Sequence, residues 1–438
     1  MRFELPDGLP PLWQYKSLGG VCSRITSGGT PSRREEKYYG GDISWVKTQE
    51  LFDRKIFDTD EKISLLGLNN SSAKLLPKDT VLLAMYGATV GKLGVLGKKS
   101  TCNQACCAFI CDPEITDYRF LFYCLLGNRS NLVGLATGAA QQNLSSQQLK
   151  SVEFAFPPLE YQKKMADVLS SLDDRIDHNR ALAANLEAIA RRLFKSWFVD
   201  FDPVRAKAAG EKPPGLADDI AALFPDRLVD SELGEIPEGW VFKPLSSIAE
   251  FVNGRNFTKD ATGTGRMVIR IAELSNDGPT GSTVWNDLPD TAEQYLVNPG
   301  EILFAWSGSL GLHVWDRDTG LVNQHIFKVI PKQPFVAPFV FFAMEELIDD
   351  FRAIAAGKAV TMGHIKRCDL DTHGVICPLI PDLLVEFHEI VAPLWNRVRV
   401  GRREVLALGA IRDLLLPRLI SGKLRVEDAE PIIEVTLA

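Results

Sequence analysis

One uninterrupted heptad pattern limits the folds open to this 438-residue chain. Between Pro158 and Phe198 there is no internal proline or glycine, and seam residues recur at alternating spacings of four and three. They are Met165, Leu169, Leu172, Ile176, Asn179, Ala183, Leu186, Ala190, Leu193 and Trp197. Such a repeat, sustained over several heptads, is typical of a helix with a coiled-coil seam. At about 1.5 Å per residue this helix would be about 60 Å long.

A second series with the same spacing follows 222 residues later in the chain (387 − 165 = 222). At this offset Leu172 aligns with Leu394, and Arg175 aligns with Arg397. The second seam comprises Phe387, Val391, Leu394, Val398, Gly401, Val405, Leu408, Arg412, Leu415 and Leu419. The chain is therefore an internal duplication, and we expect its two long helices to pair with each other along these seams.

One seam position carries a polar side chain. A buried polar group such as Asn179 can fix the register of two helices at a cost in stability. Its counterpart Gly401 is small enough to face it. The alternative is that Asn179 is merely tolerated near a frayed part of the seam.

The segments ahead of the two helices repeat as well. "LPKDTVLLAMYG" matches "VNPGEILFAWSG", and the dipeptide Asn103–Gln104 recurs at Asn323–Gln324. Short apolar runs alternate with short helical patterns, which is typical of an α+β domain. The predicted boundaries are 1–157 for the first globular domain, 158–236 for the first long helix and a connector, 237–380 for the second globular domain, 381–426 for the second long helix and 427–438 for a tail.

The stretch "MYGATVGKLGVL", from Met85 to Leu96, looks like a phosphate-binding loop. A P-loop needs four residues between its glycines and a hydroxyl residue after its lysine. Here three residues separate Gly87 from Gly91, and Leu93 follows Lys92. The second copy reads "SGSLGLHVW", with no lysine in this place. The pattern therefore predicts a tight turn between strands.

Composition and cysteine spacing favour an ordinary globular protein. Hydrophobic residues make up 45% and charged residues 24%, which is usual for such proteins. No apolar run reaches the roughly 18 residues of a membrane span, and "MRFELPDGLPPLW" does not resemble a signal peptide. We therefore expect a cytoplasmic protein with no membrane partner. The cluster "CNQACCAFIC" lacks zinc-site spacing, so it predicts buried strand cysteines and no metal.

No catalytic pattern is present in the sequence. It contains no NPPY-like tetrapeptide, no GxGxxG after a strand, no HExxH, no GxSxG and no EF-hand loop. The six histidines are scattered, and we expect the adjacent carboxylates Asp173 and Asp174 to face solvent on the first long helix. The chain is therefore predicted not to be an enzyme, and to bind no cofactor itself.

The net charge of −7 argues mildly against a nucleic-acid partner, but the distribution of charge along the chain permits local basic surfaces. Five lysines lie between Lys74 and Lys99 against a single acid, Asp79. Glycine-rich loops with basic and polar residues occur at corresponding places in both copies, and such loops can approach phosphate or read base edges. The candidate DNA contacts are Arg33, Arg34, Lys37, Tyr86, Lys92 and Gln141 in the first copy, and Arg255, Asn256, Lys259, Arg266, Ser307 and Lys358 in the second. For each residue the alternative is an ordinary solvated surface.

Several motifs resemble one known family. They are "YGATVGKLG", "TGAAQQNLS", "SELGEIPEGW", "LLLPRLISGKL" and the first long helix with its exit "LFKSWFVDFDPV". Together with the duplicated layout, they are similar to the DNA-specificity subunit of type I restriction–modification systems. The resemblance covers nearly the whole chain, although the second glycine turn departs from the usual form.

This resemblance implies a division of labour. Each globular domain would be a target-recognition domain that reads one half of a bipartite sequence in double-stranded DNA. The two helices would form an antiparallel coiled coil that sets the spacing of the half-sites. Modification subunits would bring S-adenosylmethionine, and restriction subunits ATP and Mg²⁺, while the specificity subunit catalyses nothing. The alternative is a non-enzymatic scaffold whose two globular domains bind proteins, which the net charge of −7 favours slightly.

Overall fold

A computed structural model describes residues 1–5, 8–136, 143–259, 261–274, 279–287, 290–357, 364–429 and 431, with backbone only at 290–292. The chain divides into two compact units. The first unit is Met1–Ile176 with Leu408–Ala438, and the second unit is Asp177–Ala407. Each unit contains one globular domain of helices and strands together with part of each long helix. The α+β class expected from the duplicated sequence is confirmed.

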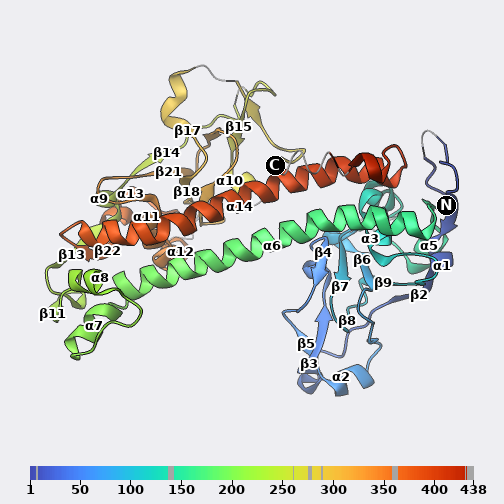
Figure 1. The fold of residues 1–438 in the computed structure, drawn as a ribbon, viewed down its shortest axis with the longest axis horizontal. Coiled ribbons are helices and arrows are strands. Elements are labelled where there is room, and N and C mark those ends of the chain that lie inside the picture. The colour runs from blue at the N-terminus through green and yellow to red at the C-terminus, as the bar shows by residue number, and fades with distance from the viewer. Residues whose placement is uncertain are drawn as a thin grey trace. The chain divides into compact units, whose positions relative to one another are not determined.

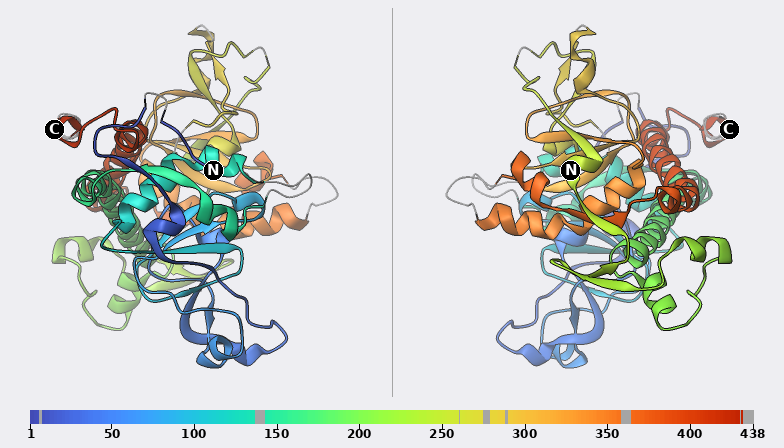
Figure 2. Two further views of the ribbon diagram at one scale, coloured as in Figure 1. Left: turned by 90° about the vertical axis from the view of Figure 1, so that its right-hand side faces the viewer. Right: turned by 90° about the vertical axis from the view of Figure 1, so that its left-hand side faces the viewer.

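The two long helices are α6 (Leu159–Phe198) and α14 (Asp382–Ile420). They pack together, as Figures 1 and 2 show. In the second unit Asn179 Nδ2 donates to Glu404 Oε2 at 2.7 Å, and Arg402 bonds Glu187 further along α6. Asn179 thus contacts Glu404, whereas the later residue Glu187 contacts the earlier residue Arg402. The two helices are therefore antiparallel.

Most seam positions are buried where the helices meet. Leu169, Leu172, Ile176, Asn179, Val391, Val398, Gly401, Leu408 and Leu415 are buried, whereas Leu186, Leu193 and Leu394 are half-buried. An α-helix turns slightly more slowly per residue than a strict heptad requires, so its buried stripe drifts around the helix. Toward the end of α6 the seam residues Ala190 and Trp197 are buried, but Phe194 is fully buried while the neighbouring seam residue Leu193 is only half-buried.

The first domain contains a five-stranded sheet in the order β2-β9-β6-β7-β4 and a three-stranded sheet in the order β5-β3-β8. Cys102, Cys106 and Cys107 are buried within these strands, as predicted, and Cys111 is half-buried. The strands are β2 (Cys22–Ser27), β3 (Tyr39–Val46), β4 (Arg54–Ile56), β5 (Lys62–Ile63), β6 (Val81–Ala84), β7 (Leu93–Leu96), β8 (Thr101–Cys102) and β9 (Cys106–Cys111).

The second domain repeats this topology. Its order β14-β21-β18-β19 corresponds to β2-β9-β6-β7, and β16-β15-β20 corresponds to β5-β3-β8. In both domains the pairing of β3 with β8, or of β15 with β20, is parallel. The strands are β14 (Ala249–Asn253), β15 (Arg266–Ile269), β16 (Trp285–Asn286), β17 (Leu296–Val297), β18 (Glu301–Ala305), β19 (Gly311–Trp315), β20 (Gly320–Val322) and β21 (Ile326–Pro331).

Shorter elements complete each unit. In the first unit they are β1 (Gln14–Ser17), α1 (Leu18–Val21), α2 (Leu65–Asn69), α3 (Tyr118–Gly127), α4 (Arg129–Gly134), α5 (Ser146–Ser151) and β10 (Glu153–Phe156). In the second they are α7 (Asp202–Ala208), α8 (Asp218–Leu223), β11 (Leu228–Ser231), β12 (Gly234–Pro237), β13 (Trp240–Pro244), α9 (Leu245–Ile248), α10 (Ile271–Leu274), α11 (Ala337–Glu346), α12 (Ile348–Gly357), α13 (Arg367–Thr372) and β22 (Gly374–Pro378). Short 3₁₀ turns lie at Glu36–Tyr38, Thr48–Glu50, Gly87–Thr89 and Asp290–Tyr295.

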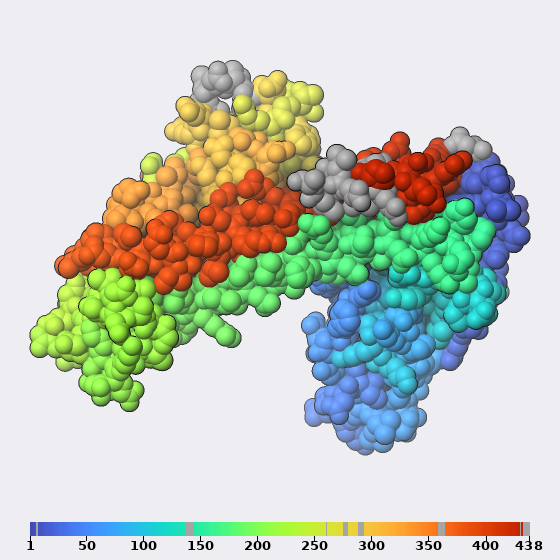
Figure 3. All heavy atoms as spheres, viewed as in Figure 1, coloured from blue at the N-terminus to red at the C-terminus, as the bar shows by residue number. Residues whose placement is uncertain are grey.

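The connector after α6 folds into the core of the second unit. Phe224, from this segment, packs edge-on against Trp197 with 5.1 Å between ring centroids, and it stacks on Trp240. Figure 3 shows the connector, in yellow-green, as a solid mass against the end of the helices. The proline-rich composition predicted only a connecting segment, but burying its aromatic rings stabilises it as packed structure. Among the described residues, none of the helices combines the length and the apolarity needed to cross a bilayer.

Candidate nucleic-acid interface

Three segments of the first domain meet just beyond the end of β6. The backbone N–H of Met85 donates to the carbonyl of Ala105 at 2.8 Å, and the carbonyl of Met85 accepts from Leu144 at 2.9 Å. Tyr86 and Asn143 also form a bridge. We call this arrangement of residue 85, residue 105 and residues 143–144 the loop frame of the first domain.

The second domain has an equivalent loop frame, made of residue 306, residue 325 and residues 364–365. The N–H of Trp306 donates to the carbonyl of His325 at 3.1 Å, and its carbonyl accepts from Ile365 at 3.2 Å. Ser307 and His364 form the matching bridge. The two copies therefore hold the same three segments by the same backbone hydrogen bonds.

A glycine holds a fourth loop against each frame. The N–H of Gly28 donates to the carbonyl of Cys106, and the N–H of Gly254 donates to the carbonyl of Ile326. A Cβ atom on Gly28 would overlap the carbonyl oxygen of Cys102, and one on Gly254 would overlap that of Asn323. Only glycine allows this close approach. The basic loops that follow these glycines begin beside the frames for this reason.

The basic loop of the first domain carries arginines in two different situations. Arg33 is exposed, donates two hydrogen bonds to the Glu61 carboxylate at 3.1 and 2.7 Å, and lies over the rings of Tyr39 and Trp45. The hydrogen bond that Arg33 donates to Glu61 raises the pKa of Arg33, and the same bond lowers the pKa of Glu61. Arg34 is exposed and has no hydrogen-bond or ion-pair partner among the described residues. Only Arg34 is therefore available without breaking an existing contact.

The other candidate residues of the first domain are also at the surface. Lys37 is exposed and pairs with Glu35 at 3.1 Å, and Lys92 is exposed 3.9 Å from Asp53. The Tyr86 side chain is 40% exposed beside the loop frame. Gln141 lies outside the described residues.

The P-loop-like stretch folds as the predicted tight turn. Gly87 and Gly91 both have positive φ, at 68° and 83°. The N–H of Gly91 donates to the carbonyl of Ala84, and the N–H of Lys92 donates to the carbonyl of Thr89, both at 3.0 Å. In a P-loop the backbone N–H groups point at phosphate. Here these two are bonded within the turn.

The candidate residues of the second domain divide between surface and interior. Arg255, Asn256 and Lys259 are exposed, and Asn256 Oδ1 accepts from the N–H of Thr258 at 3.1 Å, which shapes the loop. Arg266 is half-buried at the start of β15. Ser307 is only 5% exposed, so its hydroxyl is not a surface group, although its sequence position suggested one. Lys358 lies outside the described residues.

Sequence reasoning missed three residues of the second loop frame. The Trp306 ring contacts the rings of both His325 and His364, with ring centroids 5.1 and 5.6 Å away. Its Nε1 donates to Asn253 Oδ1 at 3.0 Å. Two features of the sequence could have pointed to these residues. Trp306 comes directly after a buried strand, and His325 comes directly after the repeated Asn–Gln dipeptide.

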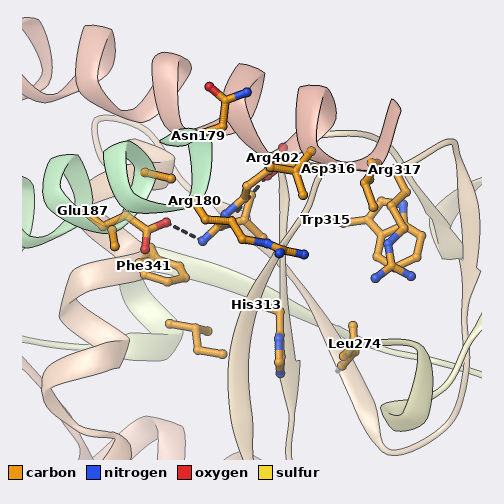
Figure 4. Close-up of a pocket in the computed structure, with 16 residues that line it drawn as sticks. Asn179, Arg180, Glu187, Leu274, His313, Trp315, Asp316, Arg317, Phe341 and Arg402 are labelled. Atoms are coloured by element: carbon orange, nitrogen blue, oxygen red, sulfur yellow. Dashed lines mark hydrogen bonds and ion pairs between the residues drawn. The ribbon is translucent and has the colours of Figure 1, made fainter. Parts of the chain in front are cut away.

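A charged cavity of about 380 Å³ lies in the second unit between α6, α14 and β19 (Figure 4). Asp316 is nearly fully buried on its wall, and its Oδ1 accepts from Arg399 Nε at 3.0 Å. Arg402 bonds Glu187 and lies 3.6 Å from Asp316 Oδ2. Burial, and then the charge of Arg402, lower the pKa of His313. These ion pairs tie the second domain to α14 through Asp316, and α14 to α6 through Glu187.

Comparisons with known proteins agree on one family. The protein-family model for the type I restriction modification DNA specificity domain matches residues 10–188 and 237–380. The type I restriction enzyme MjaIX specificity subunit of Methanocaldococcus jannaschii is 26% identical, over 96% of this chain and 95% of that protein. The HindI specificity subunit of Haemophilus influenzae is 25% identical, over 94% and 99%. The crystal structure of a type I S subunit from M. genitalium, 17% identical, matches with a TM-score of 0.54 over 95% of this chain and 98% of that one, which shows the same fold.

Proposed function

This chain belongs to the type I restriction–modification DNA-specificity family, and from that membership we propose that it selects a bipartite DNA target. Each globular domain reads one half-site in double-stranded DNA. The observation that carries this proposal is the loop frame, built twice from the same backbone hydrogen bonds. A duplicated protein has two equivalent reading units, as a dimeric repressor has for its two half-sites.

The paired helices act as the ruler between the half-sites. Each is about 60 Å long, because α6 has 40 residues and α14 has 39, at about 1.5 Å per residue. One turn of DNA is about 34 Å, so helices of this length cover the scale on which half-sites are separated. Buried polar contacts such as that of Asn179 with Glu404 support a single register.

The chain works as the non-catalytic part of a larger cytoplasmic complex. Modification subunits dock on it and supply the S-adenosylmethionine chemistry, and restriction subunits add ATP- and Mg²⁺-dependent cleavage. The absence of catalytic motifs from the sequence supports this assignment. The alternative, a protein–protein scaffold, is favoured only by the net charge of −7, and local loop charge can outweigh net charge at a DNA interface.

Selection from random duplex tests the proposal directly. The full-length chain, assembled with its modification subunit, should enrich a sequence with two defined half-sites and a fixed gap. A scaffold would enrich none.

The ruler has its own test, in which one heptad is inserted into each helix at the same level, after Ile176 and after Ala407. Seven residues add about 10 Å of helix, which corresponds to about three base pairs at 3.4 Å each. The gap should lengthen by that amount with both half-sites unchanged. An unchanged gap would refute the ruler.

A further inference from the structure

The two loop frames share a backbone but present different side chains. Where the first frame carries Met85, Ala105 and Asn143, the second carries Trp306, His325 and His364. A constant backbone with variable side chains is the arrangement expected where two copies of one domain recognise different ligands. The side chains at these positions are therefore candidates for distinguishing one DNA sequence from another.

In the second domain these side chains form a fixed aromatic cluster. The Trp306 ring is anchored by its hydrogen bond to Asn253 Oδ1 at 3.0 Å and is flanked by both imidazoles. Asn253 begins the loop that carries Arg255 and Asn256. The hydrogen bond of Trp306 therefore joins the second loop frame to the strand end that leads into the basic loop.

The backbone of His325 is strained within this cluster. Its φ is +74°, a left-handed conformation that residues with a side chain seldom adopt. The equivalent Ala105 does not have positive φ. Strain of this kind is unfavourable and concentrates at functional sites. The second frame thus holds His325 in a conformation that the shared topology does not require.

The two imidazoles share one hydrogen-bonding feature. Nδ1 of His325 and Nδ1 of His364 are both buried and have no hydrogen-bond partner among the residues that the structure describes. In a neutral imidazole one nitrogen is a donor and the other an acceptor. An N–H buried without an acceptor is costly, so the favoured tautomer carries its proton on Nε2. Each ring then offers an Nε2–H donor.

We propose that Trp306, His325 and His364 form the base-reading element of the second domain and that the two histidines donate to guanine in the major groove. Guanine presents two acceptors there, O6 and N7, whereas no other base does. Trp306 contacts both rings and supports their positions. This inference rests on the proposed DNA-specificity function and deepens it by naming the residues and the base.

The test compares sequence selection by two variants, each in the full-length chain with its modification subunit. His325→Gly relieves the positive φ, because glycine adopts it freely, and His364→Ala removes the second donor. Each should reduce discrimination for a guanine of the second half-site by about ten- to a hundredfold, with the first half-site unchanged. His388→Ala is the matched control, since its Nδ1 is also buried without a partner but it lies on α14. It should leave both half-sites unchanged.

A duplex with 7-deazaguanine at the affected position gives a second readout. This base keeps its pairing but lacks the N7 acceptor, so it should weaken binding by the unmodified chain more than binding by the variants. Unchanged guanine selection in the variants, or equal loss at both half-sites, would overturn the inference while leaving the proposed function intact. If the unmodified chain selected no bipartite sequence, the proposed function would fail and this inference with it.

Discussion

Arg412 on α14 donates from Nη1 to Asp173 Oδ1 on α6 at 2.8 Å, which joins the two long helices inside the first unit. The other oxygen of Asp173 accepts from the Tyr123 hydroxyl at 2.7 Å. One carboxylate therefore links both helices to the globular domain. The sequence-based expectation that Asp173 faces solvent is wrong, because a carboxylate between two donors is stabilised away from water. Its neighbour Asp174 is exposed, as expected.

Replacing Asp173 with alanine should destabilise the protein by about 1–3 kcal/mol, because the half-buried Arg412 and the buried Tyr123 lose a shared acceptor. Asp174→Ala is the matched control. That side chain is 64% exposed, and among the described residues its ion pair is with Lys55 at 3.2 Å, so its loss should cost less than about 1 kcal/mol. Urea unfolding of both variants measures the difference. Equal effects would show that the link across the helices is not stabilising.

A disulfide should form between cysteines placed at Ala183 and Gly401. A Cβ atom on Gly401 would lie 3.8 Å from the carbonyl oxygen of Asn179, one helical turn from Ala183. The exposed Cys368 would first be changed to serine. Non-reducing electrophoresis should show an intramolecular product independent of protein concentration. Cysteines at Ala183 and Val391 are the control and should not pair within one chain, because Val391 is about 15 Å along α14 from Gly401.

Arg33 and Arg34 should respond differently to alanine substitution. Arg34 has no partner among the residues that the structure describes, so Arg34→Ala should weaken binding to all sequences and flatten the salt dependence by about one counterion. Arg33 is held by Glu61, so Arg33→Ala tests base reading, which would relax one half-site by about 1–3 kcal/mol. Titrations on specific and random duplex at several salt concentrations separate the two effects. Equal loss at both half-sites would exclude base reading by Arg33.

Stability should fall as the pH drops below neutral because of His313. Burial and Arg402 lower the pKa of this imidazole in the folded protein, so in the window between the folded and unfolded values the unfolded chain binds more protons. This stability is fully present above the unfolded pKa of about 6.5, and it is lost as the pH falls from there through the lowered folded pKa of His313. His313→Asn should flatten this part of the pH–stability curve. A curve of unchanged slope would contradict the assignment.

The purified chain should bind neither ATP nor S-adenosylmethionine by calorimetry. The N–H groups of Gly91 and Lys92 donate to the backbone carbonyls of Ala84 and Thr89. A phosphate site would need such N–H groups free. Measurable binding of either ligand without partner subunits would contradict this prediction. The Lys92→Ala variant should be measured beside it. Its affinity for DNA should change, whereas neither ATP nor S-adenosylmethionine should bind to it.

The sequence by itself determined the duplication, the two long helices and the glycine turn. These features are local or periodic: a heptad seam and a missing lysine can be recognised in short windows without knowing what the segments pack against. The match of α6 to the expected helix reflects this, since its bounds follow from the proline before it and the unbroken apolar repeat.

Only the tertiary structure decided which side chains meet at the loop frames. Trp306, His325 and His364 come together through backbone hydrogen bonds between segments far apart in the chain, and no local pattern encodes that meeting. The same packing buries Ser307, which sequence position alone had suggested as a surface contact. Burial and pairing of a polar group depend on what the fold brings against it, so they are properties of long-range contacts rather than of sequence spacing.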